Sequence, residues 1–244
     1  MILRRFIQHV KEQNWFAVGL DVIVVIVGIF LGMQVTDWND KRNDRIKEQV
    51  FINELKRELL LYDNILETAE TRYQRSRDAV SDLLNAIHSD EVITESEFNR
   101  KTILLRHHYR FADATATLQF LISDESYQLI SNQELKKAIS DISAFISLVD
   151  QFENEETLFI NEDYMPFIMK HVDLYQSKEN ASWLKDTPDS KFKTEQELLL
   201  NSRDFSNMLV QRRNKLELVQ LFRQSVDKSI QAALEVIEQS NNNY

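Results

Sequence analysis

Residues 16–36 read FAVGLDVIVVIVGIFLGMQVT, and within this stretch Val22–Met33 is a run of twelve residues without a polar side chain. In a helix with a rise of 1.5 Å per residue, about 21 residues span roughly 31 Å, the thickness of the hydrocarbon core of a bilayer. Trp15 and Trp38 lie at its two ends, where amphipathic rings favour the membrane interface. We therefore predict one transmembrane anchor over residues 16–36, with Trp15 and Trp38 as its interfacial anchors.

Two other interpretations of this stretch are a buried helix of a soluble protein and a cleaved signal peptide. Twelve unbroken apolar residues bracketed by tryptophans argue against the first. A signal peptide ends in small residues around a cleavage site, whereas QVTDW (34–38) follows the apolar run here. We therefore expect the segment to stay attached to the chain as a single-pass anchor in the lipid bilayer.

One face of the anchor carries small and acidic residues. Asp21, Val25, Gly28 and Gly32 recur at spacings of four, three and four, which places them on one side of a helix. A G-x-x-x-G pair lets two membrane helices approach closely, and a carboxyl group in a membrane usually seeks a partner. We predict that these four residues form a transmembrane association face. The alternatives are that the glycine pair occurs by chance and that Asp21 snorkels to the interface or is protonated.

The orientation of the anchor follows weakly from its flanking charges. Three basic residues precede the anchor and four follow it closely, so the positive-inside rule hardly discriminates between the two orientations. A short tail (1–15) ahead of a single anchor usually stays in the cytoplasm. This favours an inner-membrane protein whose helical domain is periplasmic over one whose domain is cytoplasmic. The basic residues are Arg4, Arg5, Lys11, Lys41, Arg42, Arg45 and Lys47.

The residues after the anchor predict a long amphipathic helix of the coiled-coil type. Apolar residues alternate at spacings of three and four for about five heptads, interrupted only by Ser76. Because neither Gly nor Pro lies between Trp38 and Ile87, we expect the transmembrane helix to continue directly into this helix. The heptad positions are Ile52, Leu55, Leu59, Tyr62, Leu66, Ala69, Tyr73, Val80, Leu83 and Ile87.

Two capping boxes mark the starts of further helices. Thr94 with Glu97 predicts a helix that ends at Phe111, and Ser131 with Glu134 predicts the start of a second one. A shorter apolar segment lies between these two helices and ends at a polar turn.

The C-terminal half continues this helical pattern. The helix opened by Ser131 is expected to run to about Val172, with a kink at Pro166 where the helical hydrogen bonding is disrupted. We interpret residues 173–202 as a loop with short helical turns. The apolar pattern over residues 205–237 predicts the last helix.

These segments predict an all-α protein. A single N-terminal transmembrane helix continues into a long heptad-patterned helix, which packs with three or four further helices as an antiparallel bundle. The domains expected are a short basic tail (1–15), the anchor (16–36), a helical bundle domain (37–240) and a frayed tail (241–244).

Composition argues against several classes of function. The net charge of −10, with basic residues interleaved with acids, argues against a nucleic-acid binder. The absence of cysteine excludes disulfides, cysteine-ligated zinc and thiol catalysis. Only three glycines occur, all in the anchor, which argues against the glycine-rich loops of nucleotide sites.

Few side chains are arranged for chemistry. His107 and His108 are adjacent, so on a helix they would point about 100° apart and would not chelate one ion. Glu153 and Glu156 fall in phase with apolar positions, where inward acids could bind a cation or a basic ligand. We favour the alternative that neighbouring phenylalanines take the core positions and both acids are solvated.

A small-molecule pocket between helices is a further possibility. Aromatic residues such as Tyr109 and Tyr164 could line it together with the Glu153 and Glu156 pair, although helical core is the default for such aromatics. We expect no catalytic residue, no cofactor and no metal ion.

A motif surrounds the anchor: DVIVVIVG (21–28) is followed by QVTDWN (34–39). It resembles the opening of an uncharacterised bacterial family, a domain of unknown function with one N-terminal membrane helix. That family's exit reads Leu-Gln-x-x-x-Trp-Asn, and Met33 replaces the leucine here. Residues 117–135 and 202–207 resemble two later segments of the family, although the glycine of the first is missing. The resemblance implies an anchor and a helical domain, and it supplies no activity.

Three hypotheses for function follow. The first is a non-enzymatic, membrane-anchored helical interaction or sensory module that forms homo-oligomers through its anchor and stalk and contacts an unknown membrane or periplasmic protein. The second is a ligand-binding helical domain with an interhelical pocket. The third, which has the least support, is a membrane-bound hydrolase with an unrecognised site.

Overall fold

The computed structural model describes residues 15–89, 92–123, 125–175, 186, 188 and 190–242. All regular secondary structure among these residues is helical, which confirms the predicted all-α class. The chain divides into two compact units, Met1–Ile52 and Asn53–Tyr244. The basic tail ahead of Trp15 lies outside the described residues.

The N-terminal unit contains the first part of helix α2, which runs over Trp15–His88 without interruption. This continuity was predicted from the absence of Gly and Pro after Trp38. The apolar part of α2 is long and apolar enough to cross a membrane, and none of its 18-residue apolar window is buried. Its aliphatic side chains are exposed all round the helix.

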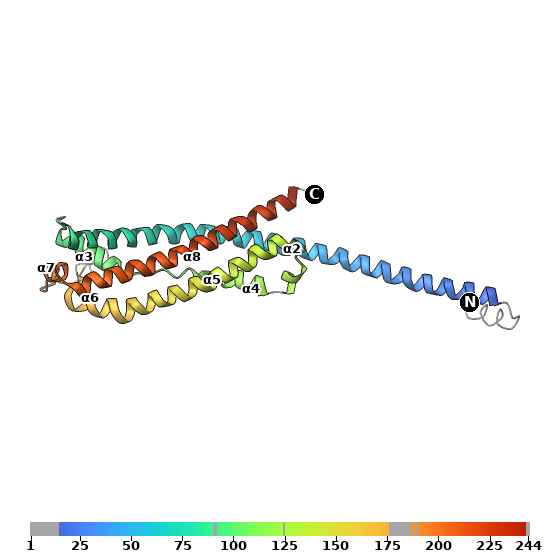
Figure 1. The fold of residues 1–244 in the computed structure, drawn as a ribbon, viewed down its shortest axis with the longest axis horizontal. Helices are drawn as coiled ribbons and strands as arrows, with labels where there is room; N and C mark the ends of the chain where they lie inside the picture. Colours follow the sequence, from blue (N-terminus) through green and yellow to red (C-terminus); the bar gives the residue numbers. More distant parts are fainter. Residues whose placement is uncertain are drawn as a thin grey trace. The chain divides into compact units, whose positions relative to one another are not determined.

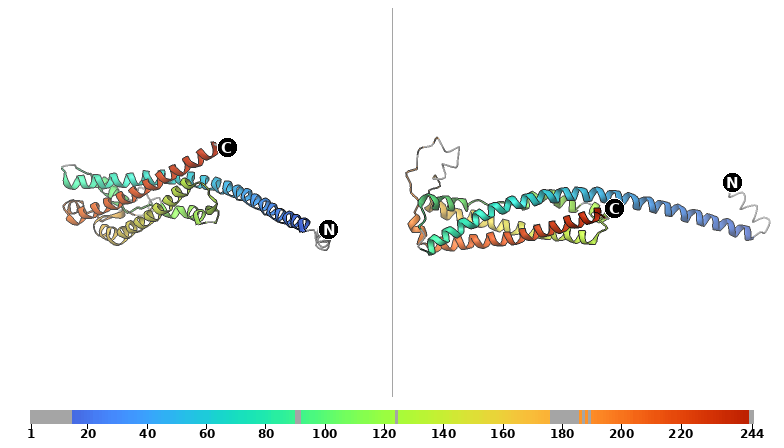
Figure 2. Two further views of the ribbon diagram at one scale, coloured as in Figure 1. Left: turned by 45° about the vertical axis from the view of Figure 1, so that its right-hand side comes forward. Right: turned by 90° about the horizontal axis from the view of Figure 1, so that it is seen from above.

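The second unit begins within the heptad part of α2, and the predicted core positions from Leu55 to Leu83 are confirmed as buried, whereas Ile87 is half-buried. Leu55, Leu59, Val80 and Leu83 are fully buried, and Ser76, which interrupts the apolar pattern, is also buried. This part of α2 lies beside the C-terminal helix α8, Arg203–Asn242, in Figures 1 and 2.

Contacts along α2 and α8 show that the two helices are antiparallel. Lys56 lies 3.3 Å from Glu238 near one end of the pair, and His88 contacts Ser206 near the other end at 3.1 Å. The third long helix, α5, covers Gln133–Phe159 and packs along α8 (Figure 1). The antiparallel bundle is therefore confirmed.

Short helices connect the long ones. The side chain of Thr94 accepts a hydrogen bond from Glu97 N, which confirms it as the N-cap of α3. The predicted end at Phe111 is wrong, because α3 ends at Leu104 and the carbonyl oxygens that follow accept hydrogen bonds from α8 side chains. The connecting elements are α3 (Glu95–Leu104), η1 (Ala112–Thr115), α4 (Ala116–Ser123) and η2 (Glu125–Leu129).

The start of α5 lies one residue later than predicted. Asn132, rather than Ser131, is the N-cap, and its side-chain oxygen accepts hydrogen bonds from the backbone N–H groups of Glu134 and Leu135. A short amide side chain can satisfy two of the four N–H groups that the first turn leaves without partners.

The irregularity predicted at Pro166 takes the form of a π-turn. The segment η3, Ile160–Tyr164, separates α5 from α6, Met165–His171. Met165 N–H donates to the carbonyl of Ile160, five residues earlier. A proline in an unbroken α-helix would clash with the preceding turn, and the wider π-turn accommodates its ring.

The remaining elements agree with the described part of the predicted loop and with the predicted last helix, apart from the end of that helix. Helix α7 covers Gln196–Leu200 within the segment interpreted as a loop with short turns. Helix α8 extends to Asn242, into the segment expected to be a frayed tail.

Candidate functional site: a buried charged layer and its cavity

Two buried ion pairs join α5 to α8. Glu156 accepts a hydrogen bond from Arg212 Nη1 at 2.5 Å, and both side chains are 1% exposed. Glu153 accepts a hydrogen bond from Arg223 Nε at 3.2 Å and a second one from its Nη2. The expectation that both acids are solvated is wrong, since each is buried and paired with an arginine of the same chain.

The irregular segment 105–110 is held by the same arginines. Every second carbonyl oxygen in it accepts a hydrogen bond from a buried guanidinium group, so side chains satisfy backbone groups that a helix would satisfy internally. This is the physical reason that the predicted continuation of α3 fails. The bonds are Arg212 Nε to Leu105 O (3.2 Å), Arg212 Nη2 to His107 O (3.1 Å) and Arg223 Nη2 to Tyr109 O (2.7 Å).

The two arginines were missed by the sequence reasoning, although a signal for them exists. Both occupy core positions in the three-and-four spacing of α8, just as Glu153 and Glu156 do in α5. Two acids in the apolar stripe of one helix and two bases in the stripe of another are complementary, and pairing satisfies all four charges. The α8 core positions are Phe205, Leu209, Arg212, Leu216, Val219, Arg223, Val226 and Ile230.

Tyr73 connects α2 to this charged layer. Its hydroxyl donates to Glu156 Oε2 at 2.6 Å, and the Arg223 guanidinium carbon lies 4.0 Å from the centroid of its ring. Burial, together with the negative charge of Glu156, raises the pKa of Tyr73. The phenol therefore stays protonated and remains a hydrogen-bond donor, so the charged layer links three long helices.

A cavity of about 310 Å³ adjoins the charged layer. Tyr109 and Glu156, two of the four residues predicted to line an interhelical pocket, are among its lining residues. Leu104 and Leu216 form part of its apolar wall. Its remaining lining side chains are Arg72, Tyr73, Arg75, Ser76, His107, His108 and Arg212.

The other two residues of the predicted pocket lie elsewhere. Tyr164 is fully buried, and its hydroxyl donates to Thr102 O at 2.8 Å. Burial raises the pKa of Tyr164, so it too remains a donor. Glu153 faces Arg223 in the charged layer. The four predicted residues therefore do not form one pocket.

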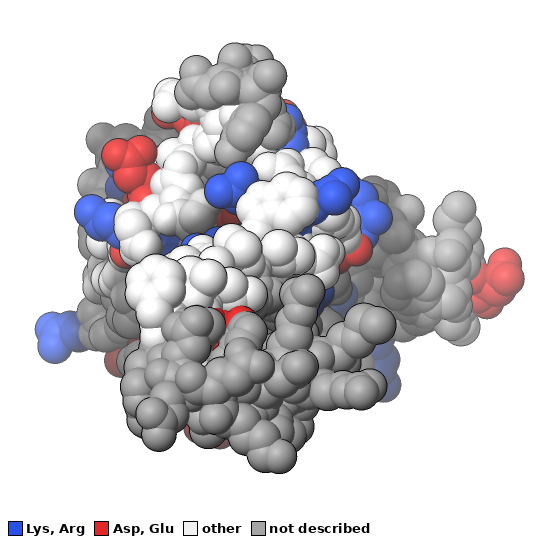
Figure 3. Space-filling model, turned by 90° about the vertical axis from the view of Figure 1, so that its right-hand side faces the viewer, with Lys and Arg blue, Asp and Glu red and all other residues white. Residues whose placement is uncertain are grey.

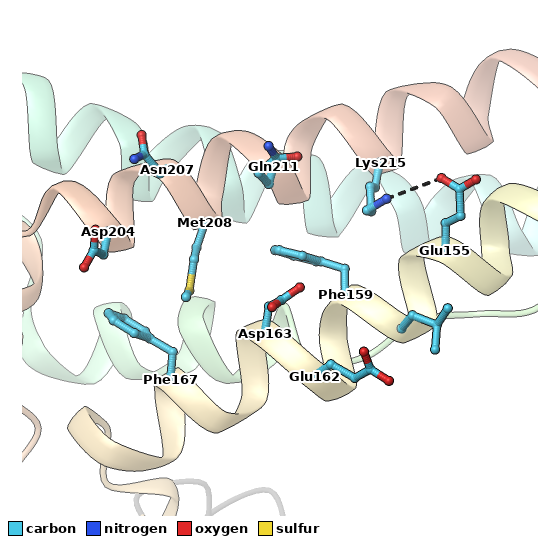
Figure 4. Close-up of a pocket in the computed structure, with 11 residues that line it drawn as sticks. Glu155, Phe159, Glu162, Asp163, Phe167, Asp204, Asn207, Met208, Gln211 and Lys215 are labelled. Atoms are coloured by element: carbon cyan, nitrogen blue, oxygen red, sulfur yellow. Dashed lines mark ion pairs between the residues drawn. The ribbon is translucent and has the colours of Figure 1, made fainter.

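A second hollow, of about 610 Å³, lies between α8 and the α5–η3–α6 segment (Figure 4). Met208 of α8 and Phe167 of α6 point toward one another across it. Lys215 lies 3.5 Å from Glu155 at one end. The other charged lining residues are all acidic, namely Glu162, Asp163 and Asp204.

The predicted association face lies on α2, in the N-terminal unit. Asp21, Val25, Gly28 and Gly32 share one side of the helix because α2 is regular there. A Cβ atom added at either glycine would meet nothing within 4 Å. This face is therefore open to an approaching helix. Trp38, one of the predicted interfacial anchors, is 65% exposed.

No metal site is found among the described residues, where no group of three or more potential ligands could hold an ion. On the face drawn in Figure 3, Lys and Arg side chains are scattered among uncharged and acidic ones. The fold and the uncovered helix define the class of protein: a helical bundle with one N-terminal helix that could span a membrane. Comparisons with protein families, curated proteins and solved structures find no match to this chain.

Proposed function

We propose that this chain is a non-enzymatic, single-pass inner-membrane protein whose helical domain is an interaction or sensory module. The observation that carries this proposal is the 18-residue apolar window of α2, of which 0% is buried. A helix that is apolar all round needs an apolar environment. A lipid bilayer supplies one along the whole of this segment.

Self-association through the anchor is part of the proposal. The open face around Gly28 and Gly32 supports it, because small residues let two helix backbones pack closely in a membrane. Crosslinking of the full chain in native membranes tests it. In the double variant Gly28→Leu/Gly32→Leu, the yield of crosslinked oligomer should fall several-fold.

The third glycine supplies a matched control. Gly19 lies nine residues before Gly28, hence on the opposite side of the helix, and a Cβ there also meets nothing within 4 Å. Gly19→Leu should leave the crosslinking yield unchanged. Unchanged yields in the double variant would refute association through this face. Full extraction of the wild type from membranes by alkaline carbonate would refute the anchor itself.

We further propose that the helical domain is periplasmic, because a short tail ahead of one anchor usually stays in the cytoplasm. Reporters fused after the C-terminus test this orientation. Alkaline phosphatase should be active there and a cytoplasm-dependent fluorescent reporter inactive, and the reverse result would place the domain in the cytoplasm. The motif around the anchor also motivates assignment to the uncharacterised bacterial family that it resembles.

A second candidate function is ligand binding in the helical domain. The cavity of about 310 Å³ favours it, since three long helices and the segment 105–110 contribute its lining. Ligand pockets typically have volumes of about 300–1,000 Å³, with apolar walls and a few convergent polar groups. A thermal-shift screen of the full chain tests this candidate, and the absence of any stabilising compound would count against it.

A further inference from the structure

The cavity beside the charged layer differs in charge from the rest of the molecule. The chain has a net charge of −10, and the hollow between α8 and α6 is lined mainly by acids. The cavity instead contains three arginines, Arg72, Arg75 and Arg212, against the single carboxylate of Glu156, and two histidines add further hydrogen-bonding groups. A basic cavity in an acidic protein is suited to an anionic ligand.

The single carboxylate does not neutralise all three arginines. Glu156 is already engaged by Arg212 and by the hydroxyl of Tyr73. Arg212 has its Nε, Nη1 and Nη2 atoms bonded to protein acceptors. Arg72 and Arg75 form no ion pair with any described residue, and the contact seen for Arg72 is with the face of the Tyr109 ring, at 5.1 Å. Among the residues that the structure describes, two positive charges of the cavity therefore have no anionic partner.

These two arginines are placed to act on one group. They are three residues apart on α2 and both line the cavity, so they lie on neighbouring positions of one helix surface. A guanidinium group presents a planar fork of donors that fits a carboxylate in bidentate geometry. The apolar and aromatic part of the lining includes Leu104, Leu216 and Tyr109, and the Tyr109 ring lies against Arg72.

We propose that this cavity binds a small organic carboxylate. Arg72 and Arg75 hold the carboxylate, and the leucine and tyrosine side chains contact an apolar body about the size of one ring. The volume of about 310 Å³ lies at the lower end of ligand pockets. Because the lining comes from α2, the end of α3, residues 107–109, α5 and α8, the bound anion ties these elements together. This inference rests on the second candidate function, and it names the ligand class.

Equilibrium dialysis of the full chain in detergent micelles tests the proposal, with radiolabelled benzoate as the probe and empty micelles as the blank. The wild type should bind benzoate saturably, and binding should weaken as salt rises. Arg75→Gln and Arg72→Gln should each weaken binding about tenfold or more, as expected for loss of a charge-assisted hydrogen bond. Because both side chains are exposed at the surface of α2, both variants should keep the wild-type melting temperature.

Arg57→Gln is the matched control. Arg57 lies on the same helix, its side chain is 76% exposed and it lies outside the cavity. It should change benzoate binding by less than about twofold, since Arg57 is not among the residues that line the cavity. Inorganic phosphate, tested by competition, should displace benzoate poorly because it lacks the apolar body. Displacement by phosphate at equal concentration would replace the carboxylate assignment with a general anion site.

Neutral benzamide separates this inference from the function on which it rests. Equal binding of benzoate and benzamide, unaffected by the two arginine variants, would keep a ligand cavity and overturn the anion assignment. Absence of saturable binding of both compounds at millimolar concentration would overturn the carboxylate proposal and remove support for the ligand-binding candidate. Neither result bears on membrane anchoring, which the extraction and crosslinking experiments address separately.

Discussion

Helix α2 contains two apolar stretches that bury their side chains in different ways. In the N-terminal unit Ile23, Ile26 and Ile29 are each about 60% exposed (58%, 59% and 61%), whereas Leu55 and Leu59 of the second unit are 0% exposed. The amino acids are similar in kind. What differs is their distribution round the helix, since the first stretch is apolar on all sides and the second only along one stripe.

This difference shows that the pattern, more than the composition, determines what a helix packs against. A stripe at three-and-four spacing is satisfied by neighbouring helices. Tyr73 of α2 contacts Glu156 of α5, and Lys56 and Arg77 of α2 pair with Glu238 and Glu217 of α8. An unbroken apolar run is covered by a bilayer or by the core of a large protein. The described part of the chain contributes no such cover to residues of the apolar window, which supports the proposed anchor.

The largest expected effect comes from the charged layer, against which the buried stretch of α2 packs. Glu156→Ala leaves the guanidinium of Arg212 buried without its carboxylate, and we expect a loss of about 3–5 kcal/mol in the free energy of unfolding. The measurement is urea unfolding of the full chain in micelles, followed by circular dichroism. Glu155→Ala is the control. Its partner Lys215 is 3.5 Å away and Glu155 is 44% exposed, so the loss should stay below about 1 kcal/mol. Equal losses in the two variants would contradict the layer's role.

The next test makes the same Leu→Ala substitution in the buried and in the exposed stretch of α2. Leu59→Ala removes a side chain that is 0% exposed, and should reduce the free energy of unfolding by about 2–5 kcal/mol through lost burial and a residual cavity. Leu31→Ala, at a position that is 57% exposed, should leave the urea midpoint of the helical domain unchanged. A similar shift for both variants would mean that the anchor stretch is packed against protein.

The sequence was sufficient for what depends on local pattern. The long apolar N-terminal helix, the heptad stripe of α2 and the Thr94 cap depend on residues close in the chain, and their positions agree with the structure. The end of α3 depends on Arg212 and Arg223, more than a hundred residues away. A local pattern carries no information about a donor that folding brings from so far.

The buried ion pairs of the charged layer can be predicted only when the apolar stripes of α5 and α8 are compared. Taken one helix at a time, the sequence favours solvation of Glu153 and Glu156, because an inward acid without a partner is strongly unfavourable. Comparing the stripes of two helices reveals acids in one and bases in the other. Of the cavity lining, the sequence predicts Tyr109 and Glu156 but not Arg72 and Arg75, because no local pattern brings these arginines of α2 together with three distant segments.

A smaller effect is expected where α2 joins the charged layer. Tyr73→Phe keeps the packed ring and removes the hydroxyl that donates to Glu156 at 2.6 Å. Because this hydrogen bond is made to a charged group, its loss should cost about 1.5–3 kcal/mol in urea unfolding. Tyr127→Phe removes a longer bond, 3.3 Å, to a backbone carbonyl, and should cost about 0.5 kcal/mol. If Tyr73→Phe left the free energy of unfolding unchanged, Arg212 alone would satisfy the carboxylate of Glu156.

The smallest expected effect concerns His107, which lines the cavity beside the charged layer. Burial and the positive charges of Arg106 and His108 lower the pKa of His107 below its usual value of 6.5, and Arg106 Nε donates to its Nε2 at 3.3 Å, which requires that nitrogen to be unprotonated. The unfolded chain therefore binds this proton more readily than the folded one. The associated stability is present above pH 6.5 and is lost as the pH falls through the lowered pKa.

His107→Gln should flatten the fall of the urea midpoint between pH 7.5 and pH 5. The effect should be slight, because the ring is partly exposed. Other titrating groups contribute equally to the wild type and the variant, so they cancel when the two pH profiles are subtracted. If both profiles have the same slope, the lowered pKa of His107 makes no measurable contribution to stability and the prediction is wrong. A steeper slope in the variant would reverse the sign of the argument and place His107 near a negative charge instead.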